Sequence, residues 1–106
     1  GDAVPYRVRD YLIFEGLAGV LAETLFPHPG LPAPEVSADK EADFWRTTDL
    51  EAVGMDAYIQ YMTRSAYEIG SRIIRHYLAT HPISIVEAHD LSDEELYWNS
   101  GYPYVR

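Results

Sequence analysis

The side chains of this sequence best suited to chemistry are His81, Glu87 and His89, which follow its longest run of periodic apolar residues. Imidazole nitrogens and carboxylates are common zinc ligands, and Pro82 predicts a turn around which the three could converge. Their spacing matches no established metal-binding motif. We therefore assign no metal and no cofactor, and keep these three residues as the candidates should a metal bind.

Motifs of catalysis are missing from the sequence. It contains no GxGxxG, P-loop, HExxH, EF-hand or GxSxG pattern. A Ser–His–Asp set could be drawn from Ser84, His89 and Asp90, as it could from most chains, and no nucleophile stands in a distinctive local context. We therefore assign no catalytic residue and expect no activity from the chain alone.

The totals indicate one domain, residues 1–106, with a net charge of −9 and no cysteine. Nonspecific nucleic-acid binding requires a positive surface, so this charge argues against a nucleic-acid partner. No signal peptide is visible, and no apolar stretch is long enough to span a bilayer. We expect a cytoplasmic protein that does not enter a membrane.

Two long helices are predicted to position everything else, one over about 6–26 and one over about 55–81. Apolar residues recur in steps of three and four along the second, which places them on one helical face. They are Met55, Tyr58, Ile59, Met62, Ala66, Ile69, Ile73 and Tyr77. Together these patterns predict an all-α fold, a small bundle of two long helices with shorter ones around them.

The remaining segments are shorter. Prolines make 27–36 a connector. Ser37 can cap a helix over 38–53, with a break near Thr47 as an alternative. Ser84 and Ser92 can each cap a short helix further along the chain. Residues 99–106 form an irregular aromatic tail, which either folds back over the core or docks on another chain.

A short stretch resembles a known family. Tyr67-Glu68, the apolar helix that follows to His81, and Ile83-Ser84 are similar to the helical N-terminal region of nitrile hydratase β-type subunits. The similarity covers under a fifth of the chain, and Tyr67-Glu68 lacks the tryptophan that usually follows this pair in that family. It implies an accessory subunit of a heteromeric enzyme and transfers no functional residue.

The first helix carries the main functional prediction. Its apolar residues cover nearly the whole circumference, and a helix of that kind is normally buried on all sides. A chain of 106 residues has little material to do this alone, so we expect a protein partner, in a homo- or hetero-oligomer. Gly16 and Gly19 predict close approach to a second helix, at Ala66 and Gly70.

We therefore expect a noncatalytic helical subunit or adaptor of a larger complex. The residues expected to bind the partner are Phe14, Leu17, Leu21, Trp45, Tyr97, Trp98, Tyr102 and Tyr104. One alternative is an acidic inhibitor or immunity-type protein that blocks a basic partner, because of the charge. The other is the accessory enzyme subunit, with His81, Glu87 and His89 as its candidates.

Overall fold

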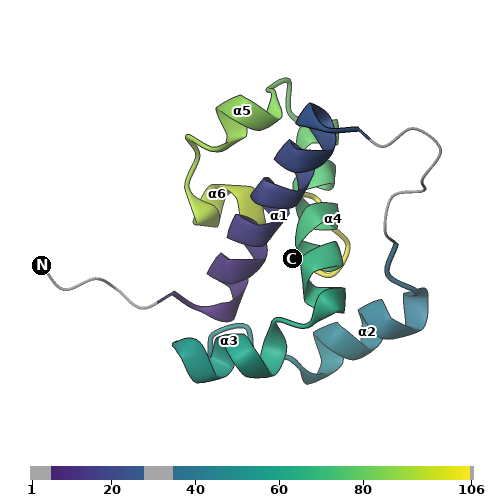
Figure 1. Cartoon of the computed structure of the whole chain (residues 1–106), viewed down its shortest axis with the longest axis vertical. Coiled ribbons are helices and arrows are strands. Elements are labelled where there is room, and N and C mark those ends of the chain that lie inside the picture. The colour runs from purple at the N-terminus through teal and green to yellow at the C-terminus, as the bar shows by residue number, and fades with distance from the viewer. Residues whose placement is uncertain (1–5, 28–34, 106) are drawn as a thin grey trace, which may run out of the picture.

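Two helices, α1 and α4, run in the same general direction and cross closely at the centre of the fold in the computed structural model, which describes residues 6–27 and 35–105 (Figure 1). The helices in chain order are α1 (Val8–Leu25), α2 (Ala38–Thr47), α3 (Met55–Tyr61), α4 (Arg64–Thr80), α5 (Ile85–Ala88) and α6 (Asp93–Trp98). Over the described ranges there is no strand, and one isolated β-bridge joins Arg7 to Val53. The prediction of an all-α fold is confirmed.

Glycine allows α1 and α4 to cross closely. A Cβ atom built on Gly70 would lie 2.4 Å from the backbone oxygen of Leu12, and one built on Gly16 would lie 2.3 Å from the oxygen of Gly70. These distances are far below van der Waals contact, so the two backbones touch where a side chain would otherwise stand. The predicted approach of Gly16 to Gly70 is confirmed.

The predicted continuous helix over 55–81 is wrong. The chain leaves helical geometry at Met62 and Thr63, so α3 and α4 are separate helices. In a straight helix, residues nine positions apart lie about 13.5 Å apart along the axis. Here the bend brings Tyr58 and Tyr67 together, and their hydroxyls form a hydrogen bond. Met62, at the bend, is buried. Tertiary packing therefore overrides an uninterrupted apolar pattern.

Serine caps set the starts of the smaller helices. The hydroxyls of Ser37, Ser84 and Ser92 each accept a hydrogen bond from the backbone N–H three residues on, which satisfies one free donor of each helix. The helix that Ser37 caps ends at Thr47, so residues 48–53 are not helical.

The tail folds back over the core. Tyr102 is 2% exposed, and Val105 is also buried. The Tyr102 hydroxyl donates a hydrogen bond to Glu41 and lies 3.4 Å from the indole nitrogen of Trp45. Gly101 makes the turn with a φ of 75°, which favours glycine. Of the two alternatives for the tail, the structure shows the first.

Most of the connector predicted over 27–36 lies outside the described residues, which resume at Glu35 with Val36 buried. None of the six helices is both long and apolar enough to cross a membrane, counting the described residues.

Candidate interaction surface

Helix α1 has two apolar sides, and the rest of the described chain covers one of them fully and the other in part. The covered side faces α4 and consists of Val8, Leu12, Ile13, Gly16, Leu17 and Val20. The outer side follows a second regular line, in steps of three and four, through Tyr11, Phe14, Ala18, Leu21 and Leu25. Phe14 is 36% exposed and Leu25 is 59% exposed, while Tyr11 and Leu21 are half-buried. We call these five residues the outer seam.

Aromatic rings extend the outer seam at the N-terminal end of α1. The ring of Tyr6 lies 4.8 Å from that of Phe14 and 5.8 Å from that of Tyr11, centre to centre, in edge-to-face arrangements. Tyr11 lies 4.8 Å from Tyr58 of α3, and Tyr58 bonds to Tyr67 of α4. The hydrogen bond with Tyr58, followed by desolvation, raises the pKa of Tyr67 to about 12. Tyr6, which precedes α1, and four rings from α1, α3 and α4 thus form one partly exposed aromatic cluster.

The outward side of α3 continues this surface. Met55 and Ile59 lie one helical turn apart and are 66% and 72% exposed. Tyr58 lies next to them on the same side of the helix, so they adjoin the aromatic cluster. We call the outer seam, the aromatic cluster and these two α3 side chains together the open face.

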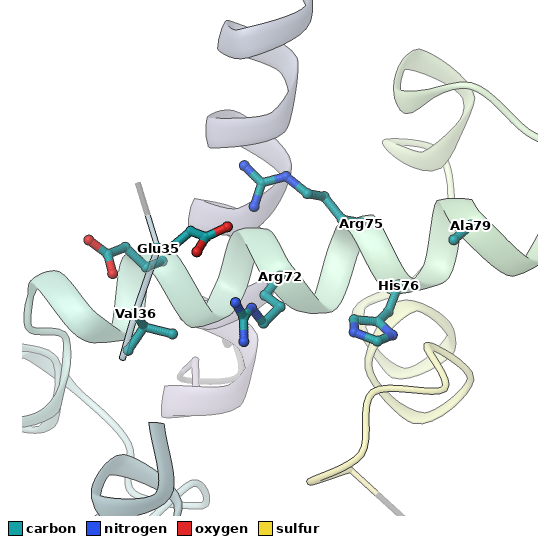
Figure 2. Close-up of a pocket in the computed structure, with 7 residues that line it drawn as sticks. Glu35, Val36, Arg72, Arg75, His76 and Ala79 are labelled. Atoms are coloured by element: carbon teal, nitrogen blue, oxygen red, sulfur yellow. The ribbon is translucent and has the colours of Figure 1, made fainter. Parts of the chain in front are cut away.

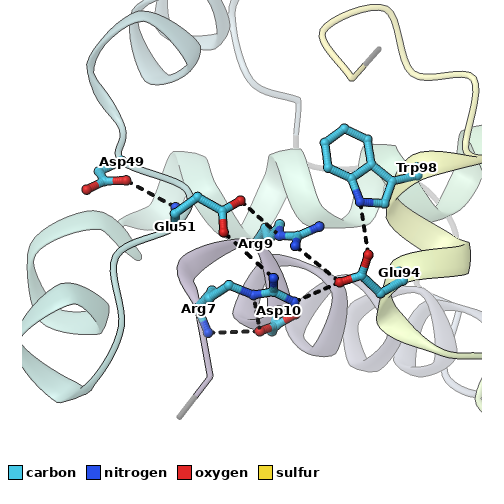
Figure 3. A network of polar contacts seen from close by, with 7 residues as sticks. All are labelled: Arg7, Arg9, Asp10, Asp49, Glu51, Glu94 and Trp98. Atoms are coloured by element: carbon cyan, nitrogen blue, oxygen red, sulfur yellow. Dashed lines mark hydrogen bonds and ion pairs between the residues drawn. The ribbon is translucent and has the colours of Figure 1, made fainter. Parts of the chain in front are cut away.

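A polar network closes the end of the molecule beside the open face (Figure 3). Arg7 bonds to Asp10 on α1 and to Glu94 on α6, at 3.1 and 2.9 Å. Arg9 is 8% exposed and contacts both Glu51 and Glu94, at 3.2 and 3.1 Å. Charged groups this buried are stable only when paired, so the network ties the start of α1 to α6 and to the segment before α3.

Aromatic rings complete the enclosure of Arg9. Its guanidinium carbon lies 5.2 Å from the ring centre of Trp98 and 5.8 Å from that of Tyr97, within range of cation–π attraction. The Trp98 indole also donates to Glu94. Burial raises the pKa of Tyr97 to about 12. The sequence pattern did not predict this network, because its members come from segments far apart in the chain.

A hollow of about 490 Å³ lies between this network and the open face, and Tyr6, Asp10, Asp93 and Glu94 contribute to its lining. The hydrogen bond from Arg7 lowers the pKa of Glu94. Desolvation, followed by the nearby charge of Asp10, raises the pKa of Asp93. The pKa values of these two neighbouring carboxyl groups therefore move in opposite directions, because the hydrogen bond with Arg7 dominates at Glu94 and desolvation dominates at Asp93.

A second hollow, of about 430 Å³, lies along α4 and contains most of the positive charge of that helix (Figure 2). Arg75 points to one side of α4, whereas Arg72 and His76 point to the other. Arg72 is paired with Glu41 and Arg75 with Glu23. Because the cations diverge and both arginines are already paired, the hollow has no convergent anion site.

The candidate metal ligands are each held locally. The Nδ1 atoms of His81 and His89 lie 2.9 and 2.8 Å from the backbone oxygens of Tyr77 and Ile85. Glu87 completes the capping box of α5 by accepting from the Ser84 N–H. In the part of the chain that the structure describes, no three His, Cys, Asp or Glu residues are placed to hold a metal ion.

The residues predicted to bind a partner divide into two groups. Leu17, Tyr97 and Tyr102 are buried in the core, so their role is to hold the fold together and they are not available at the surface. The others reach the surface in part: Phe14, Leu21, Trp45, Trp98 and Tyr104. Phe14 and Leu21 belong to the open face.

The remaining three surface aromatics lie elsewhere. Trp98 covers Arg9, and Trp45 stacks on Tyr104 with ring centres 5.7 Å apart. Five of the eight residues predicted to bind a partner thus reach the surface, two on α1 and three elsewhere.

Comparisons with known proteins give no relative: no family model, no curated protein and no solved structure matches the chain. The geometry of the open face is therefore the basis on which a function can be argued.

Proposed function

We propose that this chain is a noncatalytic helical subunit or adaptor that binds a protein partner through the open face. The observation that carries the proposal is the exposure of large apolar side chains on α1, on α3 and at Tyr6 before α1, among them Leu25, Phe14 and Ile59. Contiguous apolar patches of this kind are typical of interaction sites, and tyrosine and methionine are enriched in such interfaces.

The most exposed side chains of the open face lie outside the core. Among the described residues, twenty hydrophobic side chains form that buried core, which includes Leu12, Ile69 and Ile73. Met55 and Ile59 lie outside that core, so their exposure in a lone copy gains nothing for its stability. A partner that covers them would gain roughly 1.5–3 kcal/mol for each side chain fully removed from water.

A matched pair of double variants on α3 tests the proposal. Met55→Ser/Ile59→Ser removes two apolar side chains from the open face, whereas Asp56→Ser/Gln60→Ser changes exposed residues one position along the same helix. Tagged protein would be expressed in its native source, and co-purifying proteins quantified by mass spectrometry. We expect a near-stoichiometric partner with wild type and the control, lost with the face variant. A partner set unaffected by the face variant would refute the proposal.

A further inference from the structure

The outer seam of α1 has the spacing that a second helix recognises. Tyr11, Phe14, Ala18, Leu21 and Leu25 follow one another in alternating steps of three and four. In coiled coils and helical bundles, that spacing defines the a and d positions, whose side chains insert between those of a facing helix. The covered side of α1 is already occupied by α4, so the outer seam is a second packing line on the same helix.

The size of the seam fits a helix. From Tyr11 to Leu25 it extends about 21 Å, the length of four turns. Ala18 stands at its middle and is exposed. A small residue at the centre of a seam permits close backbone approach, while Phe14 and Leu25 on either side supply bulk.

The charges beside the seam select the partner. Between Asp10 and Phe26 the sequence contains three acidic residues and no Lys, Arg or His, and two of the three, Asp10 and Glu23, are paired with Arg7 and Arg75. Glu15 occupies the flanking e position next to Tyr11 and Phe14, and it forms no ion pair with any described residue. A helix with basic flanks would therefore be attracted, and an acidic one repelled.

A second copy of this chain fits less well. Pairing two outer seams would place Glu15 of each copy beside an equally acidic helix, and each copy has a net charge of −9. Like charges at flanking positions disfavour such pairing, and a high net charge keeps proteins monomeric.

We infer that the partner places an amphipathic helix along the outer seam, with apolar residues at three-and-four spacing and Lys or Arg beside them. This inference rests on the proposed function and names the chemistry of its partner. The Lys or Arg residues of the partner would lie along the edge of its helix that faces Glu15.

Isothermal titration with two peptides tests the inference. Each is three heptads long with leucine at a and d; one carries lysine at e and g, and the other carries glutamate. The protein variants are Ala18→Lys, at the centre of the seam, and Ala42→Lys, an exposed alanine of α2. Both substitutions add the same charge at an exposed helical alanine, and lysine retains good helix propensity.

We expect the lysine peptide to bind wild type and Ala42→Lys alike, and to bind Ala18→Lys at least about tenfold more weakly, a loss of 1.4 kcal/mol or more. The glutamate peptide should not bind, and added salt should weaken the lysine peptide. Equal binding of the lysine peptide to both variants would mean attraction by net charge alone and would overturn the inference. So would binding of neither peptide, or equal binding of both.

Light scattering of the protein without peptide tests the remaining possibility, that a second copy of the chain covers the outer seam. Self-association that Ala18→Lys abolishes and Ala42→Lys preserves would overturn the basic-helix partner in favour of a second copy. It would leave intact the proposal that the open face binds protein. Failure of the α3 variants to alter any native complex would instead remove the proposed function itself.

Discussion

The contact between α1 and α4 at Gly70 makes a quantitative prediction for the substitution Gly70→Ala. The added methyl would stand 2.4 Å from the Leu12 oxygen, whereas an ordinary carbon–oxygen contact is about 3.3 Å. The helices must therefore separate by about 1 Å at their crossing. A gap of that size forfeits roughly a quarter to a half of each dispersion contact nearby.

The expected net effect is a loss of stability. Overpacking typically costs about 1–3 kcal/mol, and a clash with backbone belongs at the upper end because no rotamer change relieves it. The gain in helix propensity from glycine to alanine offsets about 1 kcal/mol of this. We therefore expect Gly70→Ala to lower the free energy of unfolding by about 2 kcal/mol, equivalent to a fall in Tm of roughly 8 °C or more.

Gly19→Ala is the matched control. A methyl there would meet the hydroxyl oxygen of Ser71 at 2.7 Å, and that side chain can rotate away. The propensity gain then dominates, so stability should be unchanged or higher by up to about 1 kcal/mol. Urea unfolding followed by circular dichroism measures both variants. Equal stability of Gly70→Ala and Gly19→Ala would refute the close backbone crossing.

Three further predictions concern the polar contacts. Asp93→Asn should stabilise the protein at neutral pH, because the raised folded-state pKa of Asp93 makes its ionised form unfavourable; this gain should vanish as the pH falls below the ordinary pKa, near 3.8. Glu94→Gln should do the reverse, since the lowered pKa of Glu94 stabilises the fold above its ordinary pKa and that contribution is lost as the pH falls through the folded-state value. Thermal melts across this pH range test both, and melting curves shifted equally at all pH values would contradict them. Tyr102→Phe should lower the free energy of unfolding in urea by about 1.5–3 kcal/mol, because the partly buried carboxylate of Glu41 loses a hydrogen bond; an unchanged midpoint would contradict this.

Local signals in the sequence predicted much of the fold. The serine caps at Ser37, Ser84 and Ser92 act within three residues of themselves, so their spacing is sufficient to place a helix start. The pairing of Gly16 with Gly70 was also predictable, because two glycines inside apolar helical patterns indicate close backbone contact.

Tertiary contacts determined what the sequence pattern could not. The apolar line from Met55 to Tyr77 is compatible with one helix, and the break at Met62 and Thr63 has no proline or glycine to mark it. Its cause lies in packing, because α3 must turn to lie against α1 while Met62 enters the core. The fold of the tail likewise depends on Tyr102 meeting Glu41, which precedes it by 61 residues.

The open face was partly predictable. The outer seam is present in the sequence as alternating three-and-four steps from Tyr11 to Leu25, but the inner apolar line of α1 overlaps it and hides the division into two sides. The contribution of Met55 and Ile59 could not be predicted, since in an unbroken helix they would belong to the same buried line as Ile69 and Ile73. The bend before α4 is what turns them outward.

The two apolar lines of α1 also explain why a single copy folds without using both. The inner line packs on α4 through the glycine crossing, and that contact completes the core. In the outer line only Tyr11 and Leu21 pack against the core, and they do so in part, while the whole line keeps the regular spacing that helix packing requires. Four consecutive steps of three and four join Tyr11 to Leu25, and Glu15 places a carboxylate beside them. We propose that this regular spacing serves a helix that packs against the outer seam.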